Sequence, residues 1–158
     1  MRPTANGRAH KLRTMEWFNF YGLITVLLIL IPNILCAVFD KTAFENARQS
    51  KCIMILEQVG RFGCIAFMIF NVPFTCLGFW FESALAVYLI VSGALLAVYA
   101  VGWVVFWKKR HMLKMVWLSV TPTALFLFCG AMVVSAPLLV SAVLFGIGHI
   151  TISCGSAL

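Results

Sequence analysis

Charged residues are scarce in this sequence. Asp, Glu, Lys and Arg together make up 11% of the 158 residues, and only five residues are acidic. Hydrophobic residues make up 63%, and the mean hydropathy is +1.00. A soluble fold could not bury this much apolar surface, whereas lipid is a suitable solvent for it. The composition therefore excludes an ordinary soluble protein and predicts an all-α, polytopic transmembrane helical bundle.

Motifs for catalysis and cofactor binding are also missing. The sequence has no Gly-rich phosphate loop, no Ser-His-Asp order, no EF-hand and no pair of catalytic carboxylates. Its six cysteines form no C-x-x-C pair, which argues against a zinc site or a disulfide framework. We therefore predict no catalytic residues, no metal and no cofactor, and the sequence favours a function other than catalysis.

The net charge of +7 does not point to nucleic acid. The twelve Lys and Arg residues lie almost entirely in the N-terminal tail and in the connecting loops, as membrane topology signals do. The densest group is a basic cluster, which we expect on the cytoplasmic side: Lys108, Lys109, Arg110 and Lys114. The partners expected are thus the lipid bilayer and a second copy or another membrane protein, and not nucleic acid.

Long uncharged stretches predict five membrane-spanning helices, with four as the alternative count. A helix rises about 1.5 Å per residue, so roughly 20 apolar residues cross the hydrocarbon. The stretch from Met115 to Leu158 has no charged residue and is too long for one crossing, so we place a turn at Ser135–Pro137. The expected spans are about 17–39, 53–81, 83–107, 112–134 and 137–154, with Pro73 as a kink in the second.

These spans form a single domain, 17–158, in a multi-pass protein of the cell membrane. The loop between the first two spans and the basic cluster lie on one face of a five-helix bundle, which predicts an outside N-terminus and a cytoplasmic C-terminus. The basic tail, residues 1–16, opposes this orientation. It is either a real tail or an over-extended start, because Met15 offers a more ordinary beginning.

The most informative polar residues lie in the second expected span. Glu57 and Arg61 are four residues apart, so they share a helical face and are close enough for a charge-assisted bond. Asn71 continues this face. One interpretation is a substrate or proton site that faces a bundle cavity. The favoured one is an interfacial salt bridge, because charges near a helix end cost less than central ones. Asn71 either repairs the backbone at Pro73 or binds a ligand.

His149 is the only histidine well inside an apolar stretch. It could relay a proton or bind a metal or haem, but no second deeply placed histidine completes such a site. A hydrogen bond across a helix interface is the favoured interpretation. Small residues four apart also predict close helix contacts, within or between subunits: Gly93 and Ala97, Ala131 and Ser135, Ala142 and Gly146.

Two short patterns resemble parts of a known family. Glu57 with Arg61, and Phe145 with His149, are similar to the E-E-x-x-x-R and F-x-x-x-H motifs of CAAX-type intramembrane proteases. The resemblance implies an enzyme in which Glu57 and His149 meet across helices. Leu56 stands where the family has its catalytic glutamate, and no H-x-x-x-N motif follows.

Three classes of function remain. The segment 55–73 resembles small bacterial polytopic membrane proteins of unknown function, a likeness that implies no activity. An accessory or interaction protein fits the missing catalytic set best. An oligomeric small-solute transporter or channel subunit would use the polar stripe of the second span, and an intramembrane enzyme would need Glu57 and His149 together.

Overall fold

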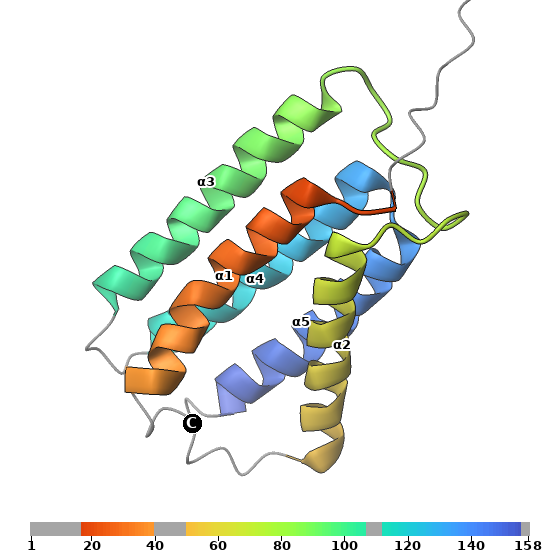
Figure 1. The fold of residues 1–158 in the computed structure, drawn as a ribbon. Helices are drawn as coiled ribbons and strands as arrows, with labels where there is room; N and C mark the ends of the chain where they lie inside the picture. The colour runs from red at the N-terminus through yellow and green to blue at the C-terminus, as the bar shows by residue number, and fades with distance from the viewer. Residues whose placement is uncertain (1–16, 40–49, 107–111, 156–158) are drawn as a thin grey trace, which may run out of the picture.

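The computed structural model describes residues 17–39, 50–106 and 112–155. These ranges hold five helices: α1 (Phe20–Phe39), α2 (Lys51–Ile69), α3 (Ala84–Val105), α4 (Met112–Val133) and α5 (Ala136–Gly155). Each helix runs opposite to the one before it, so together they form an up-and-down bundle (Figure 1). The predicted fold class, an all-α helical bundle, is confirmed.

Some of the expected features lie outside the described residues. These are the basic tail, residues 1–16, and three members of the basic cluster, Lys108, Lys109 and Arg110. Lys114 falls on the first turn of α4, but its side chain is not described.

Within the described ranges, four helices are long and apolar enough to cross a membrane. They are α2, α3, residues Val116–Val133 of α4, and α5, while α1 contributes a shorter apolar helix, Phe20–Leu35. Helices suit this solvent because their backbone polar groups are satisfied within the element. Large apolar side chains cover the outer faces, such as Ile90 on α3 and Ile147 on α5. Length, composition and surface together are those of a membrane protein in contact with lipid.

The second helix is shorter than the sequence predicts. It ends at Ile69, and the backbone is extended at Phe70, so the 70–83 segment is a loop and not the last third of a span. Pro73 therefore lies in this loop and kinks no helix, contrary to the prediction. Proline disfavours helical backbone at the preceding residue, here Val72. The loop has no charged residue before Glu82, which is why the length of the uncharged stretch does not reveal it.

Pro122 lies inside α4. The hydroxyl of Thr121 donates to the Trp117 carbonyl at 2.8 Å, and that of Thr123 donates to the Ser119 carbonyl at 2.9 Å. The proline itself frees the carbonyl four residues earlier, which lies between these two. The threonines therefore bond the carbonyls on either side of the freed one.

The core is built around α5, which packs against α2 on one side and α4 on the other. Helix α3 packs on α4, and α1 lies across α2 and α3 (Figure 1). The expected small-residue pairs divide between these contacts and the surface. Ala142 and Gly146 are buried inside the bundle, whereas Gly93 and Ala97 face outward from α3.

Candidate functional site

The candidate site is centred on the carboxylate of Glu57, on the face of α2 that packs against α5. The Glu57 side chain is 4% exposed, and its Oε1 accepts a hydrogen bond from Nη2 of Arg61 one turn later. The Arg61 side chain is 41% exposed. The expected ion pair is therefore present, and it joins a buried carboxylate to a half-exposed guanidinium.

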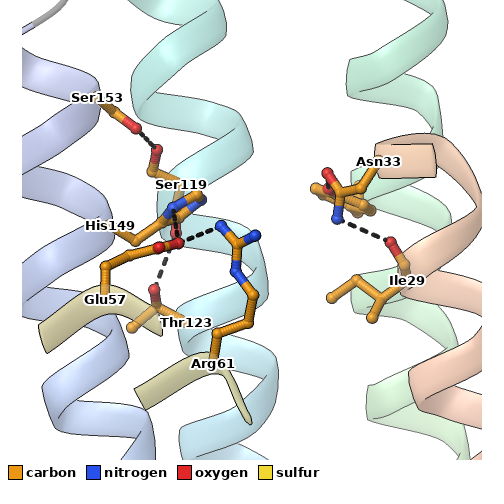
Figure 2. A network of polar contacts seen from close by, with 9 residues as sticks. Ile29, Asn33, Glu57, Arg61, Ser119, Thr123, His149 and Ser153 are labelled. Carbon is orange, nitrogen blue, oxygen red and sulfur yellow. Dashed lines mark hydrogen bonds and ion pairs between the residues drawn. The ribbon is translucent and has the colours of Figure 1, made fainter. Parts of the chain in front are cut away.

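His149 of α5 completes the group that we call the Glu57 cluster: Glu57, Arg61 and His149. The imidazole Nδ1 lies 3.3 Å from Glu57 Oε1, so the same carboxylate oxygen faces both partners (Figure 2). The imidazole also stacks on Phe145, with 4.7 Å between ring centroids and 19° between planes. Phe145 in turn meets Phe126 of α4 edge to face. These rings fix the direction in which His149 reaches the carboxylate.

Two glycines bring α2 and α5 close enough for this contact. A Cβ added at Gly148 would lie 2.7 Å from Cβ of Glu57 and 2.8 Å from its Cα. One added at Gly60 would lie 2.6 Å from Cα of Phe145. All three distances are shorter than real Cβ contacts, so neither position has room for a side chain. The helix crossing thus depends on glycine from each side.

A second set of polar contacts joins α4 to α5 beside the cluster. The hydroxyl of Ser119 donates to that of Ser153, which lies one turn beyond His149 on α5 (Figure 2). Ser119 is buried, and its carbonyl accepts the hydrogen bond from Thr123. These hydroxyls are satisfied within the chain and add to the contact between helices.

The depth of the cluster follows from the helix lengths. Glu57 lies six positions after Lys51, the first residue of α2, which is about 9 Å along the axis. Arg61 lies ten positions in, about 15 Å from the start and close to the middle of a helix of 19 residues. The pair is therefore well inside the helix, and Glu57 is covered by α5. That the pair is an interfacial salt bridge stays a prediction.

Asn71 does not join the cluster. It lies beyond the end of α2, where its backbone N–H donates to the Trp17 carbonyl at 2.9 Å. Its side-chain oxygen is 3.7 Å from the sulfur of Cys76. The prediction that Asn71 continues the polar stripe and repairs a proline kink is wrong, because the helix ends before it.

Two other polar features were missed in the sequence. Tyr99 of α3 donates its hydroxyl to Asn33 of α1 at 2.9 Å. Asn33 lies away from the Glu57 cluster (Figure 2). Gln58 is exposed on the outside of α2. The available signal in each case was a single polar residue in an apolar helix. The sequence alone does not show whether such a residue faces another helix or the outside of the bundle.

No family model, curated protein or solved structure matches this chain. Within the part of the chain that the structure describes, no group of three or more His, Cys, Asp or Glu side chains is placed to hold a metal ion. The chemistry available at the cluster is that of one carboxylate, one guanidinium and one imidazole.

Proposed function

We propose that this chain is an accessory protein that binds another membrane-spanning chain, and that the Glu57 cluster supports this role by fixing α2 on α5. The observation that carries the proposal is a polar edge on the outside of α2. This edge, which we call the α2 outer edge, is formed by Ile55, Gln58, Arg61 and Phe62. Gln58 and Arg61 are three residues apart, so they are neighbours on the helix surface.

Gln58 is unusual in its surroundings. It lies seven positions into α2, about 10 Å along the axis, between two large and exposed apolar residues, Ile55 and Phe62. Among the described residues its amide has no hydrogen-bond partner. A polar group exposed to hydrocarbon is costly, and hydrogen bonds across helices are how membrane proteins satisfy one. Gln58 therefore favours a partner helix on this edge.

Arg61 supports the same surface independently. Its guanidinium has five N–H donors, and among the described residues only Glu57 accepts from it. Its side chain is 41% exposed near the middle of the helix, where a cation is rarely left facing lipid. An acceptor on a neighbouring chain, either a carboxylate or an amide, would satisfy the remaining donors.

Transport and catalysis are less well supported. The stripe expected to line a pathway is packed against other helices, since Cys64 is 0% and Met68 1% exposed. Glu57 and His149 do meet, as an intramembrane enzyme would require. However, the carboxylate is buried between a guanidinium and an imidazole, and Leu56 provides no second carboxylate.

Replacing Gln58 with leucine should remove the partner without harming the fold, because the side chain makes no hydrogen bond within the described chain. We expect native mass spectrometry of protein released gently from its own membrane to show the wild type with an additional subunit and Gln58→Leu largely alone. Ala66→Leu is the matched control, because Ala66 is also exposed on α2. A wild type that is released as a single chain, or a Gln58→Leu complex as abundant as that of the wild type, would contradict the proposal.

The orientation proposed is an outside N-terminus and a cytoplasmic C-terminus. The ends of α1, α3 and α5 and the starts of α2 and α4 lie at one end of the bundle (Figure 1). The connections rich in Lys and Arg join these helix ends, and such loops are retained in the cytoplasm.

Reporter fusions test this orientation. A fusion after Glu82, in the loop between α2 and α3, should report the outside, and a fusion at Leu158 should report the cytoplasm. Alkaline phosphatase and green fluorescent protein activities give the two readouts. The same compartment for both fusions would rule out an odd number of crossings, and reversed compartments would invert the orientation.

A further inference from the structure

The loop between α2 and α3, residues 70–83, displays large apolar side chains at the end of the bundle opposite the basic connections (Figure 1). Phe74 is 102% exposed, Leu77 72% and Trp80 67%. The loop has a single charged residue, Glu82. Exposed apolar side chains gathered in one short loop are unfavourable in water and mark an interaction site.

Hydrogen bonds hold this loop against the turn between α4 and α5. The backbone N–H of Gly78 donates to the Val133 carbonyl at 3.1 Å, and that of Ala136 donates to the Thr75 carbonyl at 3.2 Å. Main-chain hydrogen bonds thus tie the loop to the end of α4 and to the start of α5. The outward direction of its apolar side chains is therefore part of the fold.

Phe74 takes a backbone conformation that favours outward display. Its φ angle is 67°, in the left-handed region that residues other than glycine rarely adopt. A turn closes around it, with the Thr75 N–H donating to the Val72 carbonyl at 3.3 Å. Strain of this kind persists where surrounding contacts or function maintain it. Here it directs an aromatic ring away from the protein.

We propose that Phe74, Leu77 and Trp80 insert into the boundary between headgroups and acyl chains of the adjacent leaflet. The loop starts where α2 ends and finishes where α3 begins, so it is continuous with the lipid-facing surface of two spanning helices. Tryptophan prefers this depth because its ring is apolar and its N–H is polar. The loop contains no basic residue that would attract anionic headgroups, so the expected lipid is uncharged or zwitterionic.

Tryptophan fluorescence in phosphatidylcholine vesicles tests the proposal. The Trp80 signal is obtained as the difference between the wild type and Trp80→Phe, a conservative change at an exposed position. We expect this signal to be quenched several-fold more by lipids brominated near the headgroup than by aqueous iodide, with weaker quenching by lipids brominated near the chain end. Quenching by iodide and not by brominated lipid would overturn the proposal, and so would quenching by neither, which would mean that protein covers the loop.

A second variant makes the test independent of Trp80. Phe74→Trp adds a tryptophan at the most exposed position of the loop, where it meets no neighbour that it could displace. Its added emission should show the same preference for brominated lipid. If this emission is instead accessible to iodide, the loop lies in water and the proposal fails.

Discussion

Replacing Glu57 with glutamine is expected to lower the free energy of unfolding by about 3 kcal/mol, within the range for breaking a buried ion pair. Glutamine keeps the size of the side chain but removes the charge that balances Arg61 near the middle of α2. The change can be measured by unfolding in mixed detergent micelles. Glu82→Gln is the matched control, because Glu82 is exposed in the loop before α3 and should tolerate the same change.

The other two members of the Glu57 cluster make this prediction more specific. Arg61→Gln should also lower the free energy of unfolding, because the buried carboxylate then keeps His149 as its one partner among the described residues. If both variants are as stable as Glu82→Gln, the cluster is not a structural contact, and a substrate or proton site becomes the better interpretation.

Exchanging the two charges should not restore stability. Position 57 is enclosed by the backbone of α5 at Gly148 and faces His149, so an arginine there would be crowded and would leave the imidazole without its carboxylate acceptor. The order of the two charges therefore matters, although a spacing of four residues would by itself allow either order.

Replacing Gly60 with leucine is expected to cost about 3 kcal/mol or more, because overpacking a close contact forces helices apart. A side chain at this position would collide with the backbone of Phe145 and Leu144, and neither can move without shifting α5. Separation of α2 from α5 would also pull Glu57 away from His149. The measurement is again detergent unfolding, together with the yield of folded protein.

Gly93→Leu is the control for this variant. Gly93 is also a glycine within a helix, but a Cβ there would meet nothing within 4 Å. Removing a glycine from a helix interior favours the helix by up to about 1 kcal/mol, so this variant should be as stable as the wild type or slightly more stable. Equal losses for Gly60→Leu and Gly93→Leu would mean that the crossing of α2 and α5 does not depend on glycine.

The sequence predicted the parts of the fold that depend on local pattern. Uncharged stretches located the helices, and the spacing of Glu57 and Arg61 predicted their ion pair. The turn near residue 135 was also placed correctly. Each of these follows from distances along a single chain segment, which the helix repeat fixes.

The parts that were missed depend on contacts between segments far apart in the sequence. Whether His149 reaches Glu57 is decided by the crossing of α2 and α5, and hence by Gly60 and Gly148, whose partners are not visible in either helix alone. Asn71 was misplaced because the uncharged stretch continues beyond Ile69, where the helix ends. Gln58 was overlooked because its exposure depends on which face of α2 the neighbouring helices leave uncovered.

The structure divides the polar residues of α2 between two surfaces. Glu57 turns inward and is satisfied by Arg61 and His149, whereas Gln58 and part of Arg61 remain on the outside. Polar groups of the first kind stabilise a helix packing, and those of the second kind need a partner from elsewhere. This division is the reason for placing the function of the chain on its outer surface.

The most direct test is a cryo-electron-microscopy structure of the complex purified from its own membrane into lipid nanodiscs. The account predicts a spanning helix of another chain against Gln58 and Arg61, with an acceptor side chain near the guanidinium, and a closed contact between Glu57 and His149. A solvated cavity or bound solute at Glu57, with only lipid along the α2 outer edge, would contradict it and would favour transport or catalysis at the Glu57 cluster.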